Sequence, residues 1–203
     1  MGAEMTAKKP LPLEGIRVLD VSQVMAGPFC CMLLGDLGAD VIKVEPPTGD
    51  QTRSAMGFRL RGDDSLGFLN MNRNKRSIAL DLKSAPDREI FLKLAATADV
   101  IVENYRPGVV AKLGIDYDSV AAINPGIIVC DISGYGNDGP DRDRKAYDLL
   151  IQSESGFLSV TGTPEEVTKA GPSIADISAG MYAYSNILAA LLERQRTGKG
   201  RHI

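Results

Sequence analysis

Asp176 is the residue of this 203-residue chain that points most directly to chemistry. It is the only charged residue in the segment Gly171-Pro-Ser-Ile-Ala-Asp-Ile-Ser-Ala-Gly180. Apolar residues at helical spacing follow it, so the pattern places Asp176 at a junction between a loop and a helix. Two interpretations are open there. Asp176 is either an N-cap whose carboxylate accepts a backbone N–H, or a carboxylate that acts as a nucleophile or base in a dry site.

The histidine and cysteine content limits the other kinds of catalysis. The single histidine, His202, lies at the end of the chain, which disfavours Ser-His-Asp triads, Cys-His pairs and His-based metal sites. The cysteines are odd in number and two are adjacent (Cys30, Cys31, Cys130), which suits neither a disulfide framework nor zinc-ligand spacing. We therefore expect no metal, acid–base chemistry from carboxylates, Tyr or Lys, and a reducing, cytoplasmic location.

Positive side chains gather near the ends of the predicted strands. Ligands of open α/β sheets bind beyond the carboxyl ends of the strands, so these side chains could converge on one multiply charged ligand. A solvated surface is the other interpretation of the same group. Asn104, directly after a predicted strand, could add an uncharged hydrogen bond. The positive residues considered are Lys83, Arg106, Lys112 and Lys145.

Composition indicates an ordinary globular chain, 44% hydrophobic and 24% charged, with one sizeable core. Lys and Arg total 23 against 26 Asp and Glu, and the net charge of −3 does not favour a nucleic-acid-binding face. No stretch approaches the ~20 apolar residues of a membrane span. Residues 1–12 lack the apolar core of a signal peptide, and we expect them to form a flexible leader.

Strand and helix patterns alternate along the rest of the chain, which predicts a doubly wound, mostly parallel, Rossmann-like α/β sheet. A further strand could begin at Arg201. The predicted strands are 16–21, 40–45, 77–82, 100–103 and 127–132. The predicted helices are one that follows a turn at Ala26-Gly-Pro28 and ends at Leu37, 86–97, a short one after Gly108, 117–123, 147–157 and 176–196.

The sequence Gly134-Tyr-Gly-Asn-Asp-Gly139 matches the G-x-G-x-x-G pattern of dinucleotide-binding loops. A polar loop, Pro140-Asp-Arg-Asp-Arg-Lys145, follows it in place of the helix that should hold a pyrophosphate. The glycines are therefore interpreted as turn residues, and a nicotinamide oxidoreductase is disfavoured.

Several segments, in order and at the expected spacing, together resemble the family III CoA-transferases, which include formyl-CoA transferase. The resemblance covers residues 13–203. The segments are Val18-Leu-Asp-Val21, Ala26-Gly-Pro28, Leu34-Gly-Asp-Leu-Gly-Ala-Asp-Val-Ile-Lys-Val-Glu45, Gly49-Asp50, Asn74-Lys-Arg-Ser-Ile-Ala-Leu-Asp-Leu-Lys83, Ala98-Asp-Val-Ile-Val-Glu-Asn104 and Leu188-Ala-Ala-Leu-Leu-Glu-Arg-Gln-Arg-Thr-Gly-Lys-Gly200.

The resemblance implies coenzyme A as a substrate, and the basic cluster agrees because CoA carries several phosphates. It places Leu80 and Lys83 near the adenosine phosphate end of CoA. It implies further CoA-binding positions at Val24, Asn104, Tyr105, Lys112 and Lys145. Two positions depart from formyl-CoA transferase, because Pro46 and Lys112 each stand where that enzyme has Arg, so the phosphate contacts should differ in detail.

The resemblance also makes Asp176 the catalytic aspartate, which attacks an acyl-CoA thioester and carries CoA to an acceptor acid through anhydride and aspartyl-CoA intermediates. Small neighbours (Ala175, Ser178, Ala179) would let the acyl group approach. The related α-methylacyl-CoA racemases are an alternative, although they carry His where Tyr147 stands here. A Tyr with a pKa of about 10 is a poor base at neutral pH, which favours transfer.

The resemblance also bears on domain organisation. Family members are longer, with a second, smaller domain, a Gly-rich loop over the active site and two interlocked subunits. We therefore expect residues 13–203 to form the N-terminal CoA-binding domain of a truncated chain that is a homodimer at full length. The remaining alternative is a non-catalytic CoA-binding or assembly module.

Overall fold

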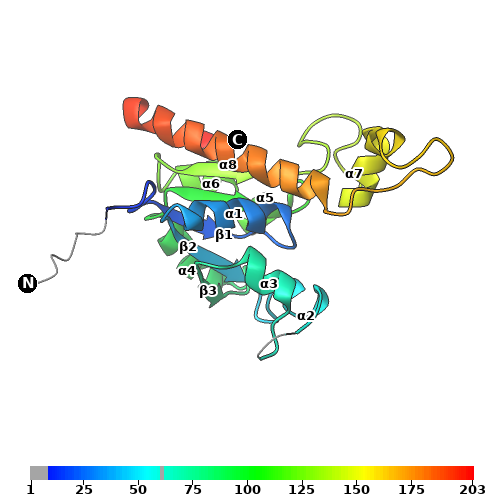
Figure 1. Cartoon of the computed structure of the whole chain (residues 1–203). Coiled ribbons are helices and arrows are strands. Elements are labelled where there is room, and N and C mark those ends of the chain that lie inside the picture. The colour runs from blue at the N-terminus through cyan, green and yellow to red at the C-terminus, as the bar shows by residue number, and fades with distance from the viewer. Residues whose placement is uncertain (1–8, 60–61) are drawn as a thin grey trace, which may run out of the picture.

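The computed structural model describes residues 9–59 and 62–203 and shows a parallel, six-stranded sheet with helices on both faces (Figure 1). The strand order is β3-β2-β1-β4-β5-β6, and every pair of neighbouring strands is parallel. This confirms the predicted doubly wound α/β class, with the order reversing between β1 and β4. The strands are β1 (Arg17–Asp20), β2 (Asp40–Glu45), β3 (Lys75–Ala79), β4 (Val100–Glu103), β5 (Ile128–Asp131) and β6 (Arg201–His202).

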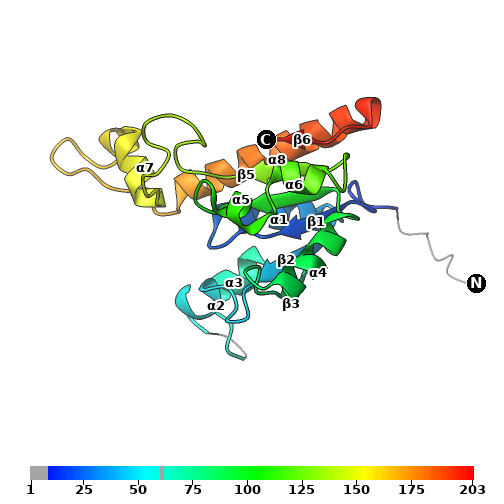
Figure 2. The ribbon, with the colours of Figure 1, turned by 180° about the vertical axis from the view of Figure 1, so that it is seen from behind.

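Helices cover the two faces of the sheet in separate layers. Helices α1 and α8 pack together on one face, and α4, α5 and α6 cover the other, as the opposite views of Figures 1 and 2 show. Helix α7 lies beyond the sheet, near the start of α8. The helices are α1 (Ala26–Asp36), α2 (Thr52–Ala55), α3 (Leu66–Met71), α4 (Ala85–Ala95), α5 (Val109–Leu113), α6 (Tyr117–Ala121), α7 (Asp148–Glu154), the 3₁₀ turn η1 (Phe157–Val160) and α8 (Ile174–Thr197).

The central strands are apolar on both sides because helices bury both faces. In β1, Val18 packs into the cluster under α1 and α8, whereas Leu19 packs into the cluster on the opposite face. Val100 and Ile101 of β4 divide between the two clusters in the same way. The two-sided core fixes which side chain of each strand points to which face, and therefore where the residues after each strand emerge.

The structure corrects the predicted boundaries of one strand. Strand β3 begins at Lys75, two residues earlier than predicted, and ends at Ala79. A lysine at the start of a strand reads as loop sequence, but the Lys75 ammonium is buried and lies 2.7 Å from the Asp20 carboxylate. Pairing with a residue far away in the sequence therefore allows this strand to start with a charge.

Other features agree with the sequence or add to it. The predicted strand at Arg201 is present as β6, and the segment from Gly134 to Gly139 is a loop with no helix directly after it. Helices α2 and α3 were not predicted. The predicted leader falls partly on residues 1–8, which lie outside the described residues. Among the helices of the described residues, none has the length and apolar character needed to cross a membrane.

The close contact between α1 and α8 depends on Gly180, so we expect Gly180→Ala to lower the free energy of unfolding by ~1–3 kcal/mol. A Cβ there would lie 2.6 Å from the Ala26 carbonyl oxygen and 3.0 Å from a ring carbon of Phe29, so the helices would have to separate. Urea unfolding measures the change. Ser185→Ala, at an exposed position of the same helix, is the control and should change stability by less than ~0.5 kcal/mol. Equal effects of the two substitutions would contradict this account of the helix contact.

Candidate functional site

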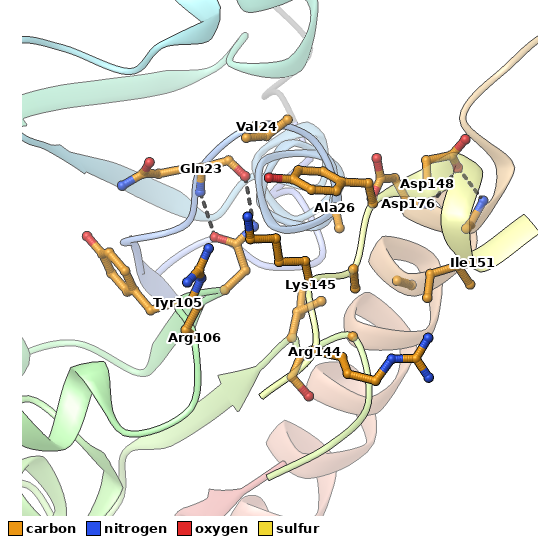
Figure 3. Close-up of a pocket in the computed structure, with 18 of the residues that line it drawn as sticks. Gln23, Val24, Ala26, Tyr105, Arg106, Arg144, Lys145, Asp148, Ile151 and Asp176 are labelled. Carbon is orange, nitrogen blue, oxygen red and sulfur yellow. Dashed lines mark hydrogen bonds between the residues drawn. The ribbon is translucent and has the colours of Figure 1, made fainter. Parts of the chain in front are cut away.

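A cavity of about 580 Å³ lies beyond the carboxyl ends of β1, β4 and β5. It therefore includes the place where the strand order reverses, between β1 and β4, which is where open α/β sheets bind ligands. Its walls come from the loops after these strands and from α7 and α8. Figure 3 shows Asp176 and Asp148 on one side of the cavity and Tyr105 and Arg106 on the opposite side.

Asp176 lies in the first turn of α8 and lines the cavity. The helix begins at Ile174, so the prediction that Asp176 could be its N-cap is wrong. Asp148 supplies the missing acceptor, because its Oδ1 accepts the backbone N–H groups of Ala175 at 2.9 Å and of Asp176 at 3.4 Å. A carboxylate from α7 thus caps α8, so the Asp176 side chain is not needed to cap its own helix.

Burial is the largest influence on the ionisation of Asp176. Desolvation raises the pKa of its carboxyl, and the negative charge of nearby Asp148 raises this pKa further. Asp148 is itself held in place, because Gln152 donates a hydrogen bond from Nε2 to its Oδ2 at 2.6 Å. Gln152 is buried and accepts the N–H of Ala170 at 3.0 Å. These contacts tie the loop before α8 to the pair of aspartates.

Basic side chains line other parts of the same cavity. Arg106 follows β4, and Arg142 and Lys145 belong to the loop after β5. Arg144 also lines the cavity, but its guanidinium pairs with Glu154 and Asp141 and lies over the Tyr135 ring. Cations opposite a carboxylate suit a ligand that presents negative charge at one end and a reactive carbonyl carbon at the other.

The structure brings together most of the residues proposed from sequence. Lys83 and Lys112 are exposed and lie outside the cavity lining, and Leu80 is buried in the core under α4. The predicted residues that line the cavity are Val24, Asn104, Tyr105, Arg106, Lys145 and Asp176. The small neighbours Ala175 and Ala179 line it as well.

Two carboxyl groups, one buried and one half-buried, lie at the ends of β4 and β5, next to Tyr105 of the cavity lining. Glu103 and Asp131 are opposite each other in the register of β4 and β5, and the Tyr105 N–H donates to Glu103 at 2.6 Å. Burial raises the pKa of Glu103 to about 8, and Asp131 contributes to the rise. Asp131 Oδ1 is a buried oxygen with no hydrogen-bond partner among the described residues, so a proton on the neighbouring Glu103 would offer it a donor. His202 holds the other oxygen of Asp131 at 2.7 Å.

Sequence reasoning missed two residues of the site. Asp148 was overlooked although it directly follows Tyr147, in a position where an acidic residue opens a helical pattern. Arg142 was treated as part of a polar loop, and no spacing signal distinguishes it from its neighbours. Both reach the cavity because of the fold of the loop after β5 and the start of α7.

Comparisons with known proteins agree with this fold and identify a family. A family model described as CoA-transferase family III matches residues 13–203. The chain is 48% identical to the succinyl-CoA:glutarate CoA-transferase of Mus musculus over 95% of this chain and 44% of that protein. It is 44% identical to the acetyl-CoA:oxalate CoA-transferase of Acetobacter aceti, over 98% of this chain and 52% of that protein.

A solved structure, of a CAIB/BAIF family protein from Brucella suis, superposes with a TM-score of 0.92 at 43% identity. The match covers 96% of this chain and 53% of that one. The chain thus spans about half the length of the relatives it matches.

We expect Asp148→Asn to lower the pKa of Asp176, because the substitution removes a neighbouring negative charge and keeps the oxygen that caps α8. Asp148→Ala should lower this pKa too and also destabilise the protein by ~1 kcal/mol through loss of the cap. Carboxyl NMR titration and urea unfolding measure the two effects. Asp118→Asn, an exposed first-turn aspartate of α6, is the control. An unchanged Asp176 titration in Asp148→Asn would refute the coupling.

The folding stability should fall as pH rises, because Glu103 holds a proton in the folded state. Its pKa is about 8 when folded against an ordinary 4.5, so the folded state binds more protons between these values. The contribution of Glu103 to the free energy of unfolding is complete below about pH 4.5 and is lost as pH rises through about 8. Urea unfolding over this range should show a shallower decline for Glu103→Gln, whereas the exposed control Glu166→Gln should follow the wild type. Parallel profiles for Glu103→Gln and wild type would contradict this assignment.

Proposed function

We propose, because the chain belongs to CoA-transferase family III, that its cavity binds an acyl-CoA thioester and that Asp176 is the nucleophile. The observation that carries the proposal is the Asp176 carboxylate, half-buried at the start of α8 and facing basic residues across one cavity. Its raised pKa makes the ionised carboxylate more basic and hence a stronger nucleophile. Ala175 and Ala179 leave room beside it for an acyl group.

The reaction transfers CoA in two symmetrical halves. The Asp176 carboxylate attacks the thioester carbonyl carbon, the C–S bond breaks, and a mixed anhydride and CoA thiolate form. The thiolate then attacks the aspartyl carbonyl carbon, which releases the donor acid and leaves an aspartyl-CoA thioester. The acceptor carboxylate opens this thioester through a second anhydride, and the returning thiolate yields the acceptor's CoA thioester and free Asp176.

The cavity should limit access of water, because water hydrolyses anhydrides. Tyr105, Arg106 and Lys145 are placed to hold the CoA chain and its negative charges along the ends of β4 and β5. Lys83, exposed after β3 at the same edge of the sheet, is placed to meet the nucleotide end of so long a ligand. The second domain and the homodimer stay predictions of the resemblance, and the cytoplasmic location stays a prediction from the cysteine content.

We further propose that the acceptor acids are dicarboxylic acids. The names of the relatives support this, since they specify glutarate and oxalate as acceptors. One carboxyl group of such an acid would react at Asp176 while a lining cation, Arg106 or Arg142, neutralises the other.

Racemisation at the α-carbon is less well supported. That reaction needs a second base beside Asp176, and Tyr147 is the titratable residue of the cavity at the position that carries His in the racemases. The histidine, His202, is stacked on Tyr117 and bonded to Asp131, outside the cavity lining.

Trapping of the aspartyl intermediate tests the mechanism. The protein is incubated with succinyl-CoA and a panel of mono- and dicarboxylic acceptors, then treated with hydroxylamine, and its peptides are mapped by mass spectrometry. We expect hydroxamate at Asp176 and transfer to dicarboxylates, with Asp176→Ala slowing transfer by ~10³-fold or more. Asp138→Asn, in the exposed loop after β5, is the matched control and should keep full activity.

Three outcomes would overturn parts of this proposal. Normal transfer by Asp176→Ala would exclude Asp176 as nucleophile. Proton exchange at the α-carbon without transfer would favour the racemase chemistry. Binding of CoA with no hydroxamate formation and no transfer would identify a non-catalytic CoA-binding module.

A further inference from the structure

Val24 has an unusual backbone conformation at the edge of the cavity. Its φ is +67°, in the left-handed region, although it is β-branched and that region is costly for such residues. It follows β1 in the loop that leads to α1, and its side chain is 39% exposed and lines the cavity. A strained residue at a ligand-facing position persists only when the surrounding structure holds it there.

Asn104 provides the first of two restraints on this loop. Its Oδ1 accepts the Gln23 N–H at 2.8 Å, and its Nδ2 donates to the Gln23 carbonyl oxygen at 2.8 Å. The Gln23 carbonyl belongs to the peptide unit that ends at the Val24 nitrogen. Fixing this peptide plane therefore fixes one side of the Val24 φ rotation. Figure 3 shows these paired bonds beside the cavity as dashed lines.

Buried ions provide the second restraint, one residue earlier. The Ser22 carbonyl accepts a hydrogen bond from Lys43 Nζ at 3.0 Å, and the Ser22 N–H donates to Asp20 Oδ1 at 3.1 Å. Lys43 is 1% exposed and also pairs with Asp50 at 3.0 Å. Because Ser22 and Lys43 are buried, water does not compete for the hydrogen bonds of the Ser22 backbone. The peptide units before Val24 are thus held from two directions.

We propose that Asn104 is a positioning residue, which keeps the strained Val24 peptide in place as a preformed wall of the cavity. Both polar groups of its side chain are engaged with Gln23, so its effect on a ligand passes through the loop. Because the strained conformation of Val24 is already fixed in the free protein, ligand binding does not have to supply the free energy of ordering this loop. The inference deepens the proposed function, since it rests on CoA as the ligand of this cavity.

The test compares Asn104→Ala with Asn124→Ala. Asn124 is a matched control because its amide also donates to backbone carbonyls, those of Ala95 and Ala98, away from the cavity. Amide hydrogen exchange of residues 21–27 and calorimetric CoA affinity are measured. Asn104→Ala should raise the exchange rate and weaken CoA binding by about tenfold each, as expected for two lost hydrogen bonds. Asn124→Ala should change neither, although urea unfolding should show that it destabilises the protein as well.

Val24→Gly supplies the second readout, because glycine adopts positive φ at no steric cost. In a Val24→Gly background Asn104→Ala should change exchange and affinity much less than in the wild type. Equal changes in both backgrounds, or unchanged exchange of residues 21–27 in Asn104→Ala, would overturn the positioning role. Failure of wild-type protein to bind CoA would instead overturn the proposed function, and hydrogen exchange would still decide the role of Asn104.

Discussion

The common direction of the strands places the carboxyl ends of β1, β4 and β5 at one edge of the sheet, and the site depends on this. The chain leaves β1 toward α1 on one face of the sheet and leaves β4 toward α5 on the opposite face. The loops after these two strands therefore diverge and leave a cavity between them. Asn104 and Asp176 are far apart in the sequence, yet both line this cavity. The fold therefore assembles a site from segments that share no local pattern.

Buried charges connect the end of β1 to the two strands beyond it, β2 and β3. Lys43 and Lys75 both approach the Asp20 carboxylate, at 3.9 and 2.7 Å, and all three side chains are almost inaccessible to water. Such groups cost desolvation energy, and their mutual pairing offsets that cost. A network of this kind specifies one arrangement of neighbouring strands, because any shift would leave an unpaired ion in the core.

Sequence patterns were informative where the determining forces are local. Strands 40–45 and 100–103 were predicted to the residue, since apolar runs bounded by polar residues define them. The start of β3 was not, because the burial of Lys75 depends on Asp20 across the sheet. Asp176 was found through its isolation among small residues. Asp148 was missed because its role requires the start of α7 to lie against the start of α8, which no short segment encodes.

The proton on Glu103 changes the net charge of the protein and the electrostatic potential that an anion meets near the cavity. The formal net charge of −3 counts this carboxyl as ionised, whereas a pKa of about 8 leaves it neutral at pH 7 and makes the net charge about −2. The removed charge would have lain directly behind the wall that carries Tyr105. The local potential is correspondingly more positive, so an anion approaching through solution meets less repulsion, an effect that is largest at low ionic strength.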